Sequence, residues 1–274
     1  MGTIQHDPAT VQVRRRPTPR SQTIDRATLI LTCFTTEQPH LTLADLATKL
    51  DLNQSTVYRY VATLQAAGLL DRDERRGGYR LGLRVVELAY VALNQLDVRK
   101  EALPEMDRLR DELQLLVNLA VLDQGDVIHL AHSVPVGWPV WATTPGRRAV
   151  ANCTALGKAL LAHRPWDEVR RGIERHGWRP YTPRSIQDFD RLAADLAKTR
   201  ERGYAVDDEE RSPGVACLAA PIRDHAARVV AALSVTGKIE KLTPDTRPHV
   251  ARRVVEAANR VSFHLGYVVG YAYL

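Results

Sequence analysis

The segment from 41 to 81 constrains the fold most, because it carries start and stop signals for two short helices in close succession. Thr42 precedes an apolar-periodic stretch and Asp45 follows three residues later, which is an acidic variant of the helix capping box. Asn53 can cap a second helix, and Gly68 suits the position just past its end. Two short helices joined by so brief a turn predict a helix-turn-helix.

A further helix precedes this pair and a hairpin follows it. An apolar helical face begins after Ser21 and consists of Ala27, Leu29, Ile30, Leu31 and Phe34. After the helix pair, two short apolar runs at 69–70 and 79–81 flank a polar turn that contains two glycines, which predicts a β-hairpin. A hairpin in this place would be the wing of a winged helix-turn-helix.

The second helix of the pair is expected to read DNA. Val57, Val61 and Leu64 form an apolar stripe that should be buried, which turns the polar residues of the helix toward the major groove. These candidates for DNA contact are Gln54, Ser55, Thr56, Tyr58 and Arg59. Gln suits adenine and Arg suits guanine, while hydroxyls and helix N-terminal N–H groups can hold a phosphate. Arg75 and Arg76 at the tip of the hairpin could contact the backbone or the minor groove.

The N-terminal residues 1–20 contain three prolines, four arginines and little apolar surface. We expect a disordered basic arm that follows DNA, or else a plain solvated tail. The whole chain has a net charge of +6, which favours a polyanionic partner. Residues 1–80 hold 11 Lys or Arg against 8 Asp or Glu, a net charge of only +3, so the basic excess is not concentrated there.

Cysteine usage and hydropathy exclude several classes of protein. Cys33, Cys153 and Cys217 are too few and too scattered for a disulfide framework or a zinc ribbon. His129 and His132 are three apart in an expected strand-to-loop stretch and would not share a face neatly, so no metal site is expected. No apolar run approaches the roughly 18 residues of a spanning helix, and there is no apolar signal core. These features predict a cytoplasmic protein with no membrane partner and no cofactor.

Beyond residue 98 the pattern becomes a mixture of helices and strands. Helices are expected around 102–115, 155–162, 189–201 and 248–265, and strands at 117–122, 127–131, 215–221 and 229–235. Runs of strands with helices on one face predict an antiparallel sheet in an α+β fold. The amphipathic stretch 83–97 would be a linker helix, whose aliphatic face could alternatively pair with a second subunit.

The sequence resembles the IclR family of bacterial regulators in six segments that keep the family's order and spacing. These segments are 41–46, 55–59, 78–82, 153–159, 203–207 and 214–221, and the resemblance extends over nearly everything from 24 to 266. It implies a winged helix-turn-helix, a helical linker and a GAF-like effector-binding domain, which we place at 21–82, 83–97 and 98–274, after the disordered basic arm expected from composition at 1–20. It also implies a homodimer or homotetramer that binds a palindromic operator in double-stranded DNA.

The resemblance further implies a small-molecule effector, an organic acid or an aromatic metabolite. Carried over by motif position, the ligand-facing residues are Thr154, Ala155, Leu156, Asp207, Val215 and Cys217. Backbone N–H groups at the start of a helix suit a carboxylate. Trp138 and Trp141 stand where family pockets often place aliphatic residues, so a flat ligand is favoured unless these indoles only pack a loop. The stretch 150–152 also departs from the family's usual Pro-Leu-His.

Two rival functions use the same residues. An architectural DNA-binding protein without effector would leave the long segment after residue 97 unexplained. A hydrolase would need Cys153 or Cys217 as its nucleophile, but neither lies in a recognisable nucleophile signature, so no enzyme is expected. The acidic run 207–210 could hold a cation, although we expect a solvated acidic turn. The sequence does not distinguish a repressor from an activator.

Overall fold

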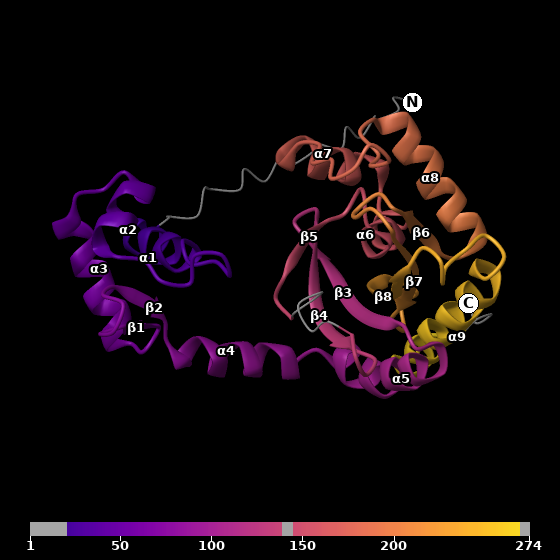
Figure 1. Cartoon of the computed structure of the whole chain (residues 1–274), viewed down its shortest axis with the longest axis horizontal. Coiled ribbons are helices and arrows are strands. Elements are labelled where there is room, and N and C mark those ends of the chain that lie inside the picture. Colours follow the sequence, from indigo (N-terminus) through magenta and orange to yellow (C-terminus); the bar gives the residue numbers. More distant parts are fainter. Residues whose placement is uncertain (1–20, 139–144, 269–274) are drawn as a thin grey trace, which may run out of the picture. The chain divides into compact units, whose positions relative to one another are not determined.

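The computed structural model describes residues 21–138 and 145–268 (Figure 1). The chain divides into two compact units, one up to Val91 and one from Ala92, and each is described by itself. The expected basic arm and Trp141 lie outside the described residues.

The N-terminal unit is a winged helix-turn-helix. Its elements are α1 (Gln22–Thr32), α2 (Leu43–Leu50), α3 (Gln54–Ala66), β1 (Leu70–Arg72) and β2 (Tyr79–Leu81), and α4 (Leu83–Asn94) follows. The expected capping box is confirmed: the Asp45 N–H donates to the Thr42 hydroxyl at 3.1 Å, and the Thr42 N–H donates to the Asp45 carboxylate at 2.8 Å. The hairpin is confirmed by the antiparallel pairing of Leu70 with Leu81.

The core of this unit lies between the three helices and the hairpin. Val57, Val61 and Leu64 are buried, as the apolar stripe predicted, and they pack with Ile30. The prediction that Leu29 shares this face is wrong, because its side chain is 52% exposed. Successive side chains on a helix point about 100° apart around its axis. Because Ile30 faces the core, the adjacent Leu29 points away from it.

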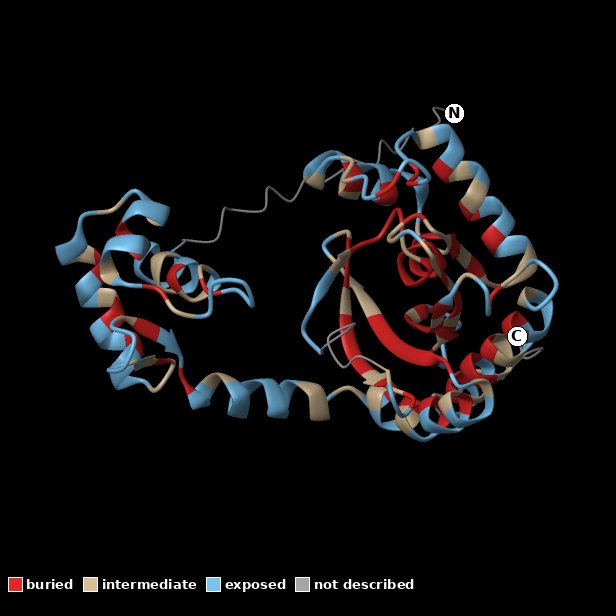
Figure 2. Ribbon diagram, in the orientation of Figure 1, coloured by how far each residue is buried: buried red, intermediate tan, exposed pale blue. Residues whose placement is uncertain are grey.

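Helix α4 has no buried residue within the described chain (Figure 2). Most of its large apolar side chains are well exposed, namely Leu83, Val86, Leu88, Tyr90 and Val91, whereas Val85 and Leu93 are partly buried. The helix therefore derives little stability from packing inside the described chain, and its pairing with a second subunit stays a prediction.

In its described residues, the C-terminal unit is built on one six-stranded antiparallel sheet. The strands are β3 (Leu116–Asp123), β4 (Asp126–Ser133), β5 (Arg148–Val150), β6 (Ala205–Asp208), β7 (Val215–Arg223) and β8 (Val229–Lys238), and their order is β5-β4-β3-β8-β7-β6. The helices are α5 (Asp97–Leu113), α6 (Ala155–Leu161), α7 (Trp166–His176), α8 (Phe189–Arg202) and α9 (Arg247–His264). The sequence pattern did not predict α7, β5 or β6. No helix among the described residues is long and apolar enough to cross a bilayer.

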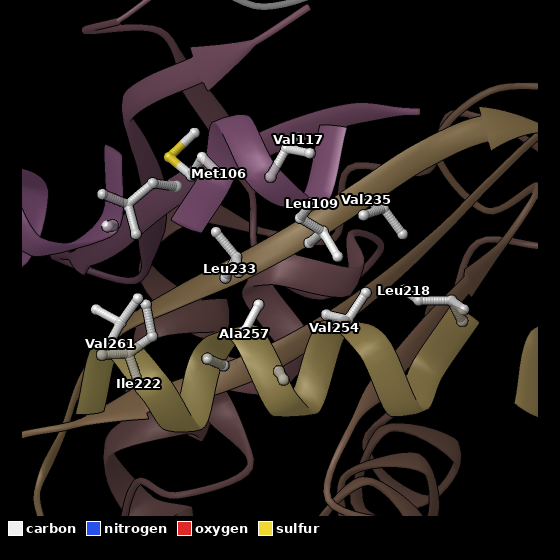
Figure 3. Packing of buried hydrophobic residues seen from close by; sticks show 14 of the residues in the cluster. Met106, Leu109, Val117, Leu218, Ile222, Leu233, Val235, Val254, Ala257 and Val261 are labelled. Carbon is white, nitrogen blue, oxygen red and sulfur yellow. The ribbon is translucent and has the colours of Figure 1, made fainter. Parts of the chain in front are cut away.

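Helices cover both faces of this sheet, so the expectation of helices on one face is wrong. On one face, Met106 and Leu109 of α5 and Val254 of α9 pack against Leu233 and Val235 of β8 (Figure 3). On the other face, a second apolar cluster joins α6, α7 and α8 to the sheet. The α6 face contains the cavity described below.

Candidate nucleic-acid interface and ligand cavity

Helix α3 presents a polar surface on the side away from its buried stripe. Gln54, Ser55 and Arg59 are exposed, and the side chain of Tyr58 is 57% exposed although it is aromatic. Thr56 is partly buried. A large aromatic side chain held in solvent at a helix surface suits stacking or phosphate contact. Contact of these residues with DNA stays a prediction.

The N-terminus of α3 is closed by Asn53. The Asn53 carboxamide oxygen accepts the Thr56 N–H at 2.8 Å and the Ser55 hydroxyl at 3.0 Å. This cap stabilises the first turn. It also means that the Ser55 hydroxyl must leave Asn53 before it can donate to a phosphate, so Ser55 is a weaker candidate for phosphate contact than the sequence indicated.

The tip of the hairpin is ordered by Asp73. Its carboxylate accepts the backbone N–H groups of Arg75 at 3.1 Å and Arg76 at 3.2 Å, and the hydrogen bond from Arg76 is the main reason that the pKa of Asp73 lies below its ordinary value. His40 Nδ1 lies 3.1 Å from the same carboxylate. Arg75 and Arg76 are exposed, and this turn keeps both residues together at the tip, as contact with DNA would require.

The C-terminal unit contains a cavity of about 770 Å³ on the α6 face of the sheet. All of the expected pocket residues that the structure describes line it, namely Trp138, Thr154, Ala155, Leu156, Asp207, Val215 and Cys217. The volume lies in the range of small-molecule sites. Occupation of this cavity by an effector stays a prediction.

A row of polar side chains crosses the sheet at the wall of the cavity. Asn118 of β3 pairs in register with Ser234 of β8, Thr236 pairs with Cys217 of β7, and Cys217 pairs with Asp207 of β6. Side chains on paired strands point to the same face, so these residues form one surface. Sequence reasoning missed Asn118, Ser234 and Thr236. The available signal was a polar residue inside an apolar strand run, as at 116–122.

Three basic side chains also line the cavity, and the sequence reasoning missed each of them. They are Arg147, Arg211 and Lys238. The Arg211 guanidinium lies 3.6 Å from the centre of the Tyr181 ring, a cation–π contact that restricts its movement. Helix α6 is only seven residues long, so these side chains contribute more positive potential than its dipole does.

The acidic run 207–210 is not a solvated turn, contrary to the expectation. Asp207 and Glu210 are buried, and the Asp207 carboxylate accepts the backbone N–H groups of Glu210 at 2.8 Å and Arg211 at 3.2 Å. Lys158, which is 1% exposed, forms an ion pair with Glu210 and lies 3.1 Å from Asp195. Burial raises the pKa of Asp207 to about 7, and it also raises the pKa of Glu210.

The two cysteines of this unit lack the chemistry of a nucleophile. Burial raises the pKa of Cys153 to about 12 and raises the pKa of Cys217 as well. Both thiols therefore stay protonated near neutral pH, whereas a reactive cysteine needs its thiolate. The Cys217 sulfur lies 3.2 Å from the Thr236 hydroxyl.

One histidine, His129, lies on the described part of the wall, and it is neutral near pH 7. His129 is buried, and burial with nearby Arg147 lowers its pKa to about 4. No group of three potential metal ligands occurs among the residues that the structure describes. The wall of the cavity therefore offers hydrogen-bonding groups, charged side chains and apolar surface.

Comparison with known proteins identifies both units. Residues 23–74 match the IclR helix-turn-helix domain, and residues 90–263 match the bacterial transcriptional regulator IclR C-terminal domain. The chain is 29% identical to the transcriptional regulator XynR of Escherichia coli K12, over 91% of this chain and 99% of that protein. It is 30% identical to the transcriptional repressor AllR of the same strain, over 93% of this chain and 97% of that protein.

A solved structure shares the fold. The crystal structure of an IclR homologue from Microbacterium hydrocarbonoxydans in complex with 4-hydroxybenzoate superposes with a TM-score of 0.78 at 26% identity, over 89% of this chain and 98% of that one. Both curated relatives are named as regulators of transcription, which agrees with the raised pKa of the Cys153 and Cys217 thiols. The winged helix-turn-helix, the helix-covered antiparallel sheet and these matches together show that the chain belongs to the IclR family of bacterial transcriptional regulators.

Proposed function

We propose that this regulator binds its operator through α3 and the hairpin tip, and that a small organic acid or aromatic metabolite in the cavity modulates this binding. The observation that carries the proposal is the lining of the cavity. Basic side chains, hydrogen-bonding groups and the flat apolar surface of Trp138 meet around one space of about 770 Å³. Such a combination suits an anion with an apolar body.

The Microbacterium homologue supports an aromatic acid as the ligand class, because its crystal structure is a complex with 4-hydroxybenzoate. An architectural DNA-binding protein would have no use for a cavity with this polar wall. We therefore propose the division 21–82 for DNA binding, 83–97 for linkage and 98–274 for sensing.

In this proposal two or four copies of the chain bind a palindromic operator, with recognition helices about one DNA turn apart. The ligand shifts the equilibrium between arrangements of the DNA-binding units, and the coupling free energy is of the usual size, about 1–3 kcal/mol. Helix α4 connects the two units and is the element through which the shift would pass.

The test combines a gel-shift titration with a thermal-shift screen. The DNA flanking the protein's own gene is titrated with the full chain, with and without benzoate, 4-hydroxybenzoate, pyruvate and the neutral amide 4-hydroxybenzamide. A ligand that binds the folded state must raise the melting temperature. We expect at least one of these compounds to raise it and to change operator affinity about 5- to 150-fold. No thermal shift with any compound would contradict the effector proposal.

A further inference from the structure

The cavity holds more positive than negative side chains, and its one acidic side chain has an unusual setting. Among the described residues, Arg147, Arg211 and Lys238 line the cavity together with one carboxyl group, that of Asp207. The three basic side chains would attract an anion, whereas Asp207 would repel it if its carboxyl group were ionised. The protonation state of Asp207 therefore decides how well an anion can bind.

Asp207 shares its surroundings with two further carboxylates and one ammonium group. Lys158 from α6 is buried and already pairs with Glu210 of the turn and Asp195 of α8. Its positive charge is thus divided between two carboxylates before Asp207 is considered. The two buried carboxylates of Asp207 and Glu210 and the partly buried one of Asp195 share one ammonium ion, which leaves an excess of negative charge that water screens poorly.

The other ionisable groups around Asp207 do not remove this excess. The groups that face it are Lys158 from α6, Cys153 before α6, Cys217 from β7, Glu210 and Arg211 in the following turn, and Asp195 beyond Glu210 on α8. Both cysteines stay as neutral thiols, and Arg211 is held against Tyr181. The backbone N–H groups of Glu210 and Arg211 bind one Asp207 oxygen and only partly offset the burial.

We propose, as an extension of the proposed function, that the ligand of this cavity is an anion that binds together with one proton, which Asp207 takes up. The negative charge of the ligand favours the neutral form of Asp207. A neutral carboxylic acid has an O–H donor, so Asp207 changes from a group that repels the anion into one that can donate a hydrogen bond to it. The bound complex therefore holds one more proton than the free protein above the pH at which free Asp207 ionises.

This linkage has a fixed sign. In free protein the pKa of Asp207 is about 7, and the bound anion raises it further. Below that pH the proton is already present and anion affinity does not change with pH. Above it, each pH unit weakens anion binding by up to about tenfold, until the pKa of the bound state is passed. Binding of a neutral ligand would show no such loss.

The experiment measures binding of benzoate, 4-hydroxybenzoate and pyruvate to the full chain by calorimetry between pH 6 and pH 8.5. These acids stay ionised at the carboxylate throughout, since ordinary carboxyl pKa values lie near 4. Repeating the titration at pH 8 in two buffers with different ionisation enthalpies counts the protons taken up. We expect close to one proton per anion at pH 8, none at pH 6, and affinity that falls about tenfold or less per unit.

Asp207→Asn provides the variant arm, because its carboxamide oxygen can still accept the two backbone N–H groups. We expect this variant to bind the same acid with no proton uptake and with equal affinity at pH 6 and pH 8. Asp190→Asn, at an exposed position on α8, is the matched control and should behave as wild type. Should the Asp207 variant not fold, the proton count on wild type decides alone.

The outcomes separate this inference from the proposed function. An acid that binds wild type without proton uptake at pH 8 overturns the inference and leaves the effector proposal standing. Binding of the neutral 4-hydroxybenzamide without binding of any acid also overturns the inference and leaves the effector proposal standing, because the ligand is then not an anion. Absence of binding by every compound at pH 6 overturns both.

Discussion

Lys158 of α6 and Glu210 of the turn after β6 form a buried ion pair, although 52 residues separate them in the chain. The pair joins α6, whose first residue lines the cavity, to the turn after β6. This turn carries Arg211, which also lines the cavity. Asp195 of α8 is the second partner of Lys158. One ammonium group thus fixes three segments around the candidate ligand site.

Lys158→Met should lower the free energy of unfolding by about 3–5 kcal/mol at pH 7, because it leaves buried carboxylates without their cation. Urea denaturation of the full chain measures the loss. The double variant Lys158→Met/Glu210→Gln should recover part of it, and Lys198→Met, exposed on α8, should change little. If Lys158→Met lowered the free energy of unfolding by less than about 1 kcal/mol, the ion pair would contribute little to stability.

Asp207 should make the protein less stable as the pH rises. Its folded pKa of about 7 lies above the ordinary 3.8, so the stability it contributes is complete below pH 4 and is lost as the pH passes 7. Relative to Asp207→Asn, wild type should lose up to about 4 kcal/mol between pH 4 and pH 8. His129, with a pKa lowered to about 4, acts in the opposite direction but equally in both proteins. If the stability curves of wild type and Asp207→Asn ran parallel over this pH range, the raised pKa of Asp207 would be refuted.

Gly157→Ala should destabilise the C-terminal unit by about 1–3 kcal/mol or more, because an added Cβ would lie 2.2 Å from the carbonyl oxygen of Ala151. Both residues are buried, so neither backbone segment can move away easily. Gly172→Ala in α7 is the matched control: its Cβ would meet only an ordinary contact at 3.4 Å, so it should be neutral or slightly stabilising. Thermal unfolding of both variants checks the contrast, and equal effects would argue against the close approach.

Arg59→Ala should weaken operator binding by about 1–3 kcal/mol and leave the thermal shift by an effector acid unchanged, because Arg59 is exposed on α3 and belongs to the other unit. Quantitative gel shifts on operator and unrelated DNA measure the loss of specificity. Gln65→Ala, near the far end of the same helix, serves as the control. Loss of both operator binding and thermal shift in Arg59→Ala would contradict independent units.

Cys217→Trp should abolish the effector response while DNA binding remains, because an indole at this position would fill part of the cavity. Cys217→Ser, which keeps a donor near the Thr236 hydroxyl, should retain the response. Thermal shift and gel shift on the same preparations provide the two readouts. Unchanged ligand affinity in Cys217→Trp would exclude this residue from the site.

Local signals in the sequence determined the N-terminal unit. The capping box of Thr42 and Asp45, the Asn53 cap and the buried stripe of α3 all depend on neighbours within a few residues, and each was predicted correctly. Such signals act over one helical turn, so no distant contact can reverse them easily. The motif resemblance likewise indicated part of the cavity wall, namely Thr154, Ala155, Leu156, Asp207, Val215 and Cys217.

Only the tertiary structure decided which side chains would meet around the cavity. Arg211, Lys238 and Asn118 come from segments far apart in the chain, and no spacing rule joins them. The acidic run 207–210 is polar by composition, and its burial follows from strand pairing of Asp207 with Cys217 and from the ion pair of Glu210 with Lys158. The free energy of a buried charge depends on its partners in space, so the sequence alone could not distinguish a solvated turn from a buried cluster.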